Sequence, residues 1–219
     1  MGRVTSLPPS PTRLILVRHG QTAHNRERRV QGHIDAPLDE TGHAQAARLA
    51  RHLRAEGVRA PRLLASDLAR ARATAEALHA ELGGTLNLHP ELREIFMGRW
   101  EGELYDELAV RDAELHARFW SGDPDCLAPD GENARVVGER VHALLEREWP
   151  QPGETVIVVS HGIAISALLA RLLGLDYQQE FQTRRFLHLN TAYSVLDVDP
   201  DTREIQASRL ALSPHLELV

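Results

Sequence analysis

Two short apolar runs, far apart in the chain, each end in a histidine that is followed by glycine. Residues 14–17 (Leu-Ile-Leu-Val) lead into residues 18–20 (Arg-His-Gly), and residues 156–159 (Val-Ile-Val-Val) lead into residues 160–162 (Ser-His-Gly). Short apolar runs of this kind are typical of buried strands in a parallel sheet. Open α/β sheets bind ligands where their strands end, so the sequence predicts one site built from both ends of the chain.

The amino-acid composition excludes several kinds of chemistry. All 25 basic residues are arginines, so the chain holds neither a Schiff-base lysine nor a P-loop lysine. The single cysteine, Cys126, rules out an intrachain disulfide and a multi-cysteine zinc site. The formal net charge of −6 provides no basic field for a nucleic acid. We therefore predict no nucleic-acid partner and none of these lysine-dependent cofactor sites or cysteine-based metal sites.

Length and patterning indicate one globular unit. The chain has 219 residues, of which 42% are hydrophobic, and can bury a core of its own. Its apolar runs are too short to cross a bilayer and no charged-then-apolar leader begins it, so we expect no membrane partner and a cytoplasmic location. Residues 1–12, with three prolines, are expected to form a flexible tail, and residues 13–219 a single domain. The oligomeric state is not predicted.

Strand-like and helical patterns alternate along the chain, which predicts an α/β fold: a three-layer α/β/α sandwich with a mostly parallel central sheet. We expect strands at residues 13–17, 62–65, 85–88, 154–159, 192–197 and 204–212. We expect helices at residues 41–54, 68–82, 103–120, 132–149 and 163–173. Thr41 and Asp67 are the expected N-caps of the first two helices.

Four polar clusters stand out in this pattern. They comprise residues 18–22 (Arg-His-Gly-Gln-Thr), residues 66–75, which include Arg70 and Thr74, residues 92–102 (Leu-Arg-Glu, then Gly-Arg-Trp-Glu-Gly), and residues 160–162. Their order and spacing, together with residues 31–38, resemble those of the histidine phosphatase superfamily, the phosphoglycerate-mutase-like proteins, over nearly the whole chain.

This resemblance implies a phosphoglycerate-mutase-like fold and phosphoryl chemistry on a small phosphorylated metabolite, for which no metal and no cofactor are needed. His19 matches the family's nucleophile, which forms a phosphohistidine, and Glu94 matches its general acid. Arg18, Arg70 and His161 match the residues that bind the phosphate. Planar guanidinium groups suit this ligand, because the charge of a phosphoryl transition state is spread over three oxygens.

The resemblance also implies contacts to the substrate around the phosphate. Thr22 and Asn25 match positions that hydrogen-bond the phosphate or hold the loop beside it. Gln31 and Gly32 lie in the stretch that lines the mouth of the site in this family. Gly162 removes a side chain where the backbone must approach the phosphate closely.

Neighbouring residues compete for two of these roles. Arg72 shares a helix with Arg70 but does not fit the family's arginine-alanine-x-x-threonine-alanine order, so we expect it to be solvated. Glu91 and Glu101 compete with Glu94, which is favoured because it follows a leucine–arginine pair directly.

The sequence disfavours three other classes of protein. Ser160 would invite a serine hydrolase, but Val158 stands where the nucleophile-elbow pattern needs glycine. Residues 123–125 (Asp-Pro-Asp) follow no apolar strand, so they read as a loop and not as an aspartyl-phosphate site. A non-catalytic phospho-ligand binding module is disfavoured because both His19 and Glu94 are present.

The same site serves a phosphatase or a mutase. Family mutases that use a bisphosphoglycerate primer carry a longer insertion after the acid, with tyrosines and basic residues, whereas residues 105–107 (Tyr-Asp-Glu) and 123–130 here are short and acidic. Residues 163–165 (Ile-Ala-Ile) are apolar where mutases tend to place polar contacts. The sequence therefore favours a metal-independent phosphomonoester hydrolase, with phosphoglycerate mutase as the alternative. The acidic and apolar rim disfavours a second strongly anionic group in the substrate.

Overall fold

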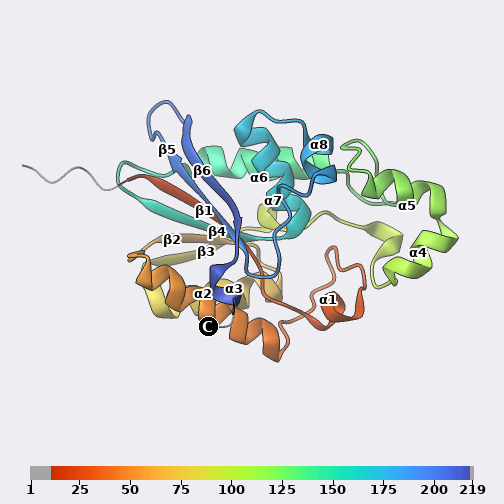
Figure 1. Ribbon diagram of the computed structural model, residues 1–219, viewed down its shortest axis with the longest axis horizontal. Coiled ribbons are helices and arrows are strands. Elements are labelled where there is room, and N and C mark those ends of the chain that lie inside the picture. Colours follow the sequence, from red (N-terminus) through yellow and green to blue (C-terminus); the bar gives the residue numbers. More distant parts are fainter. Residues whose placement is uncertain (1–10, 218–219) are drawn as a thin grey trace, which may run out of the picture.

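A six-stranded sheet forms the centre of the computed structural model, which describes residues 11–217 (Figure 1). The strands are β1 (Arg13–Arg18), β2 (Arg62–Ala65), β3 (Thr85–Leu88), β4 (Thr155–Ser160), β5 (Tyr193–Val198) and β6 (Ile205–Leu212). Their order across the sheet is β3-β2-β4-β1-β5-β6. The first four in this order are parallel, β5 runs antiparallel to β1, and β6 runs antiparallel to β5.

Helices cover both faces of the sheet. They are α1 (Ala23–Glu27), α2 (Glu40–Ala55), α3 (Ala69–Leu82), α4 (Tyr105–Arg111), α5 (Ala113–Trp120), α6 (Ala134–Arg147), α7 (Gly162–Leu173) and α8 (Tyr177–Gln182). Successive side chains of a strand point to opposite faces. In β1, Leu14 and Leu16 join a core with α6 and α7, whereas Ile15 and Val17 join a second core with α2 and α3. The predicted three-layer α/β/α sandwich is therefore confirmed (Figure 1).

The predicted strands agree with the observed ones to within one residue at each end. The apolar runs of β1, β2, β4 and β5 are buried, as strands in the middle of a sheet require. The two edge strands, β3 and β6, are largely exposed.

Two helices begin differently from the prediction. Asp39 caps α2, because its side chain accepts a hydrogen bond from the Gly42 N–H at 2.8 Å, and Thr41 lies inside the first turn. Asp67 does not cap α3, since its carboxylate forms an ion pair with Arg93 at 2.5 Å. Both predictions are wrong, for different reasons: the N-cap of α2 lies two residues earlier than predicted, at Asp39, whereas the side chain of Asp67 is held by Arg93.

The helix predicted over residues 103–120 is divided into α4 and α5. The division falls at Asp112, where the backbone leaves the helical region at φ −116° and ψ 38°, and where Oδ2 accepts a hydrogen bond from Trp100 Nε1 at 2.8 Å. The helix predicted from residue 132 begins at Ala134 behind its N-cap Asn133. Two short helices, α1 and α8, lie where no helix is predicted.

The parallel strands end on the side of the molecule where α1, α4 and α5 lie, at the right of Figure 1. Loops that follow β1, β2 and β4 therefore meet here, as the sequence predicts for a site at strand ends.

Most of the predicted tail, residues 1–10, lies outside the described residues. Thr12 belongs to the folded part, because its Oγ1 accepts a hydrogen bond from Gly153 N at 2.9 Å and its carbonyl accepts one from Val198 N at 3.0 Å. The single domain over residues 13–219 stays a prediction. None of the helices within residues 11–217 has the length and apolar character that crossing a bilayer requires.

Candidate active site

The two histidine–glycine motifs lie side by side because β1 and β4 are adjacent and parallel. Arg18 is in register with Ser160, so the next residue of each strand, His19 and His161, leaves the sheet at the same level. The two imidazole rings are 5.1 Å apart between centroids. The prediction that the ends of these two strands lie together therefore agrees with the structure.

The ring of His19 is held in one neutral form. Its Nδ1 lies 2.6 Å from the carbonyl oxygen of Gly20, and since a carbonyl only accepts, Nδ1 carries the proton and Nε2 keeps its lone pair. The side chain is buried, at 3% exposure. Burial, reinforced by the cations of Arg70 and Arg18, lowers the pKa of His19 well below its usual value. An unprotonated imidazole nitrogen is thus available beside two arginines.

Backbone carbonyls hold the guanidinium groups of the buried Arg70 and the half-buried Arg18 in place. Arg18 donates to the His188 carbonyl at 2.7 Å, and Arg70 donates to the carbonyls of Gly32 and Ile34, each at 2.8 Å. The Nε of each arginine is buried and has no hydrogen-bond partner. Burial lowers the pKa of Arg70 to about 10, against the opposing attraction of nearby carboxylates.

Arg72 occupies a different environment. It lies on the exposed side of α3, with its Nε 3.8 Å from a Glu76 carboxylate oxygen. The prediction that Arg70 faces the site and Arg72 faces solvent agrees with the structure.

His161 is buried at 0% exposure, and neither of its ring nitrogens has a hydrogen-bond partner. It stands at the N-cap position of α7, where the free backbone N–H groups of the helix favour anions. Burial lowers the pKa of His161 well below its usual value, and the charge of Arg70 adds to this effect. Buried polar atoms without partners are rare in folded proteins, so this cluster of nitrogens is suited to binding a ligand.

Glu94 reaches the same helix terminus from the other side. Its Oε1 accepts hydrogen bonds from the backbone N–H groups of Ile95 and Ala164, both at 3.0 Å, and its Oε2 accepts one from Ile163 at 3.2 Å. A Cβ placed on Gly162 would lie 3.8 Å from both Glu94 Oε2 and Arg18 Nε. The missing side chain of Gly162 thus keeps the space between the carboxylate and the guanidinium open.

The other two candidate carboxylates, Glu101 and Glu91, have partners away from the arginines of the site. Glu101 Oε1 accepts hydrogen bonds from the backbone of His33 at 2.7 Å and of Met97 at 3.2 Å. Glu91 pairs with the exposed Arg147 at 3.0 Å. Glu94 is therefore the one of the three carboxylates that lies against both the arginines and α7.

Thr22 and Asn25 form the capping box of α1. The Asn25 N–H donates to Thr22 Oγ1, and the Thr22 N–H donates back to Asn25 Oδ1 at 3.1 Å. Thr22 Oγ1 also donates to Gln31 Oε1 at 2.8 Å. Thr22 is fully buried behind the site. Of its two predicted roles, bonding the phosphate or holding the loop beside it, the structure therefore supports the second. Asn25, Gln31 and Gly32 line a small cavity beside His19.

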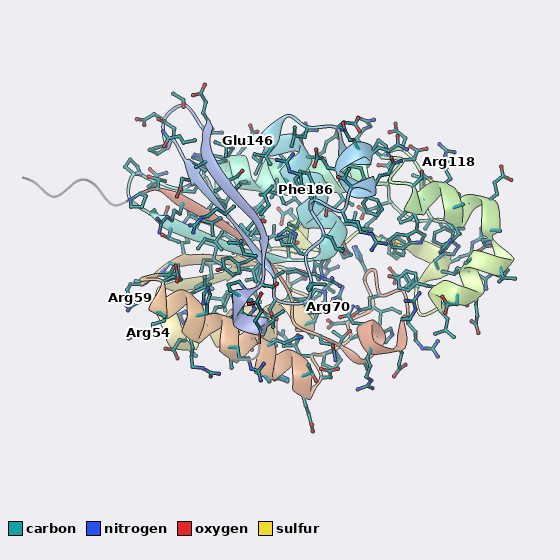
Figure 2. All side chains as sticks on the ribbon, viewed as in Figure 1. Arg54, Arg59, Arg70, Arg118, Glu146 and Phe186 are labelled. Carbon is teal, nitrogen blue, oxygen red and sulfur yellow. The ribbon has the colours of Figure 1, made fainter. Side chains whose placement is uncertain are left out.

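A small cavity of about 60 Å³ lies between these groups and opens into an outer bay of about 610 Å³. Predicted residues on the wall of the inner cavity are Arg18, His19, Asn25, Gln31, Gly32, Arg70 and Glu94. Tyr105, Trp120 and Ile163 line both spaces. In Figure 2, Arg70 and Phe186, which lines the bay, lie in the central part of the molecule, whereas Arg54, Arg59, Arg118 and Glu146 lie near its periphery.

Sequence reasoning missed a group of residues just before β5. Asn190 donates to the His19 carbonyl at 3.2 Å and to Asn25 Oδ1 at 3.1 Å, and the Thr191 N–H donates to the carbonyls of Arg18 and His19. A signal for them existed: a strand antiparallel to β1 must begin beside the end of β1.

The alternative chemistries have no support in the geometry. Ser160 Oγ is buried and donates to the Leu92 carbonyl at 2.8 Å, which ties the segment before Glu94 to the sheet. Asp123 and Asp125 form surface ion pairs. Within residues 11–217, no three histidine, cysteine or acidic side chains gather as metal ligands would.

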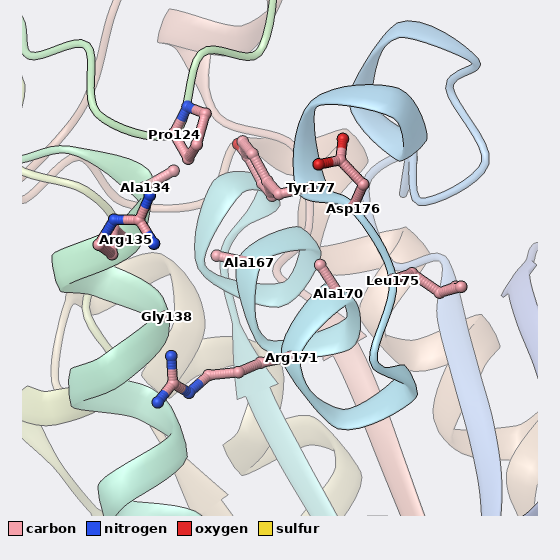
Figure 3. A pocket seen from close by; sticks show the side chains of 10 residues that line it. All are labelled: Pro124, Ala134, Arg135, Gly138, Ala167, Ala170, Arg171, Leu175, Asp176 and Tyr177. Carbon is pink, nitrogen blue, oxygen red and sulfur yellow. The ribbon is translucent and has the colours of Figure 1, made fainter.

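A separate cavity of about 250 Å³ lies between α6, α7 and the start of α8 (Figure 3). Arg135 and Arg171 lie on its α6 and α7 sides, and Asp176 and Tyr177 on its α8 side. It contains none of the predicted site residues, so the candidate active site is the cavity at the strand ends.

The chain belongs to the histidine phosphatase superfamily. The family model described as histidine phosphatase superfamily (branch 1) matches residues 14–210. A curated relative from Cronobacter sakazakii, the probable phosphoglycerate mutase GpmB, is 38% identical over 171 residues, which are 77% of this chain and 78% of the relative.

Solved structures of similar proteins include YhfR of Bacillus stearothermophilus, with a TM-score of 0.81 and 31% identity over 94% of this chain and all of that one. A mycobacterial glucosyl-3-phosphoglycerate phosphatase in complex with VO3 has a TM-score of 0.74 and 31% identity, covering 84% of this chain and 92% of the other. A putative α-ribazole-5′-P phosphatase of Escherichia coli has a TM-score of 0.73 and 30% identity, covering 91% and 94%. The curated relative is thus named a mutase, and two of these structures are named phosphatases.

Proposed function

We propose that this protein is a phosphomonoester hydrolase that works through a phosphohistidine at His19. The observation that carries the proposal is the set of buried nitrogens without partners, on Arg18, Arg70 and His161, around the neutral ring of His19. A phosphoryl group, with its three charged oxygens, is a ligand that satisfies several such donors at once.

In the first step, His19 Nε2 attacks phosphorus. The N–P bond forms as the bond from phosphorus to the ester oxygen breaks, and Glu94, as a carboxylic acid, gives its proton to the departing oxygen. Arg18, Arg70 and His161 hold the equatorial oxygens, where the charge of the loose transition state lies.

In the second step, water replaces the histidine. The Glu94 carboxylate takes a proton from water as the water oxygen attacks phosphorus, the N–P bond breaks, and its electron pair returns to His19 Nε2. Inorganic phosphate then leaves, and both side chains are back in their starting states. The backbone N–H groups of Ile163 and Ala164 fix Glu94 for both proton transfers.

Hydrolysis is favoured over isomerisation by what lines the outer bay. Besides Arg18, the bay has one arginine, Arg28, and this side chain already pairs with Asp106 at 3.1 Å. The bay's other walls include the apolar side chains of Trp120, Phe181 and Leu187. A mutase that is primed by a bisphosphate must bind a second phosphate, which this lining disfavours. The names of the similar solved phosphatases support the same choice, whereas the curated relative keeps phosphoglycerate mutase as the second candidate.

The test is phosphate release from a panel of phosphomonoesters, with a chelator present, by the wild type and by His19→Ala. The panel includes p-nitrophenyl phosphate and 3-phosphoglycerate, and the latter is also assayed for 2-phosphoglycerate with a bisphosphoglycerate primer. Release that disappears in His19→Ala supports the hydrolase. Isomerisation without release indicates the mutase, and neither reaction indicates a phospho-ligand binding module.

A further inference from the structure

The outer bay continues into a second hollow that the phosphate chemistry does not use. This hollow has a volume of about 600 Å³ and shares Trp120, Ser166, Phe181, Phe186 and Leu187 with the bay. The bay in turn shares walls with the inner cavity, so the three spaces are successive neighbours from His19 outward. We call this row of spaces the channel.

Residues of α7 line successive parts of this channel and so indicate the distance between them. Gly162, in the wall of the bay, and Ser166, in the wall of the second hollow, are four residues apart on α7, which is about 6 Å along a helix axis. The hollow therefore begins about one helical turn beyond the phosphate site, at a distance that suits the far end of the substrate's organic part.

The walls between these two ends are aromatic. The rings of Trp120 and Tyr105 are 5.3 Å apart between centroids, and those of Trp120 and Phe181 are 6.2 Å apart. Gln182 Nε2 donates to the Ser121 carbonyl at 3.0 Å, which ties α8 to the end of α5. This part of the channel suits a planar or apolar middle portion of a substrate.

Glu180 lines the second hollow and is buried, at 7% exposure. Its Oε1 lies 3.4 Å from the half-exposed guanidinium of Arg185, whereas its Oε2 is buried and has no hydrogen-bond partner. The indole Nε1 of Trp120, on the wall of the same hollow, is also buried without a partner. A buried acceptor or donor without a partner destabilises the folded protein, and a ligand that hydrogen-bonds to it removes this penalty.

Resting on the proposed hydrolase function, we propose that Glu180 and Trp120 form a distal subsite for the hydroxyl groups of a polyhydroxylated, sugar-like end of the substrate. Hydroxyl groups both donate and accept, so they satisfy the carboxylate oxygen and the indole N–H together. An ammonium group would leave the indole unpaired and would meet the charge of Arg185. An anionic group would be repelled by Glu180, although Arg184 also lines this hollow, on its exposed side.

Binding to a chain that cannot turn over tests the subsite separately from catalysis. Three phenyl phosphates that differ at the para position are titrated calorimetrically into His19→Ala: one carries a glucosyloxy group, one a cyclohexyloxy group, and one a 4-carboxycyclohexyloxy group. The dissociation constant of the glucosyloxy compound is expected to be about tenfold lower than that of the cyclohexyloxy compound, as for hydrogen bonds to a charged group.

Adding Glu180→Leu to His19→Ala is expected to bring this ratio of dissociation constants to about one, while Glu180→Gln, which keeps the shape and one acceptor, retains part of the preference. Glu114→Gln, on the exposed surface of α5, is the matched control and keeps the full ratio. Equal binding of the glucosyloxy and cyclohexyloxy compounds, a preference that survives Glu180→Leu, or tightest binding of the carboxylate would each overturn the proposal. Failure of the hydrolase function is seen separately, as absence of phosphate release from phenyl phosphate by the wild type.

Discussion

The Nδ1 of His19 donates a hydrogen bond to the carbonyl oxygen of Gly20 at 2.6 Å. This bond fixes which nitrogen of the ring is free, and it does so with a residue that follows His19 directly in the chain. The structure thus sets the ring's tautomer before any substrate binds. Arg18 and Arg70 then oppose protonation of the free nitrogen.

A first prediction concerns the protonation of His19. Because burial and the two arginines lower its pKa well below 6.5, the ring is expected to stay neutral, with its proton on Nδ1, at pH 6.5 and above. Long-range ¹H–¹⁵N NMR of the histidine rings measures this directly, with His19→Gln identifying the resonance. A midpoint near 6.5, or a proton on Nε2, would contradict the assignment.

A second prediction separates two arginines of one helix. Arg70→Met is expected to reduce kcat/KM for phosphomonoesters by about 10²- to 10³-fold, since it removes a buried charge and an unpartnered Nε–H donor that the proposed function assigns to the phosphate. The matched control is Arg72→Met, which replaces an exposed side chain on α3 and is expected to stay within about twofold of wild type. Similar losses of kcat/KM in both variants would mean that the substitutions act by disturbing α3 and not by removing the Arg70 guanidinium.

The role of Glu94 is tested by the leaving group. Glu94→Gln is expected to slow alkyl phosphates by about 10²- to 10⁴-fold but p-nitrophenyl phosphate much less, because nitrophenolate departs without a proton. Glu91→Gln, on a carboxylate that pairs with Arg147 at the surface, is expected to leave both rates unchanged. Equal losses on both kinds of substrate in Glu94→Gln would remove it as the proton donor.

A further prediction links His188 to the pH dependence of stability. Its imidazole is buried between the Phe186 carbonyl and Ser194 Oγ, and burial lowers its pKa from 6.5 to about 4. Between these two pH values the unfolded chain binds more protons than the folded one. The stabilisation is therefore complete above pH 6.5 and is lost as the pH falls to about 4, by about 3 kcal/mol.

Urea unfolding of the wild type and of His188→Gln at pH 7 and pH 4 measures this contribution. The free energy of unfolding is expected to fall between these pH values by about 3 kcal/mol less in His188→Gln than in the wild type. The exposed His43→Gln serves as the control and is expected to behave as the wild type does. An equal pH dependence in the wild type and His188→Gln would show that the buried ring does not couple to folding.

Much of the site could be predicted because its residues follow directly from strands. His19, His161 and Arg70 each stand at or just after the end of an apolar run, and the ends of parallel strands meet at one edge of a sheet. The proximity of His19 and His161 then follows from the pairing of β1 with β4, and Arg70 comes near them because β2 pairs with the other side of β4. The order of these strands in the sheet was not needed to expect them together.

What the sequence could not show depends on contacts between distant segments. At the N-terminus of α3, the Ala69 N–H donates to Asp35 Oδ1 at 2.6 Å. Asp35 lies 34 residues away in the sequence, so the residues next to the helix could only suggest Asp67 as its cap. Glu180 belongs to a stretch without regular periodicity. Its place in the wall of the second hollow appears only when α8 is seen beside that hollow.

The central claim, a covalent phosphohistidine at His19, is tested most directly by rapid-quench trapping with a ³²P-labelled phosphomonoester. Wild-type protein is expected to carry label that is released in acid and retained in base, at a rate of formation fast enough for turnover. The label is expected to be absent from His19→Ala, which is also expected to be inactive. Turnover at the wild-type rate in His19→Ala, or label on the wild type that survives acid, would contradict the account.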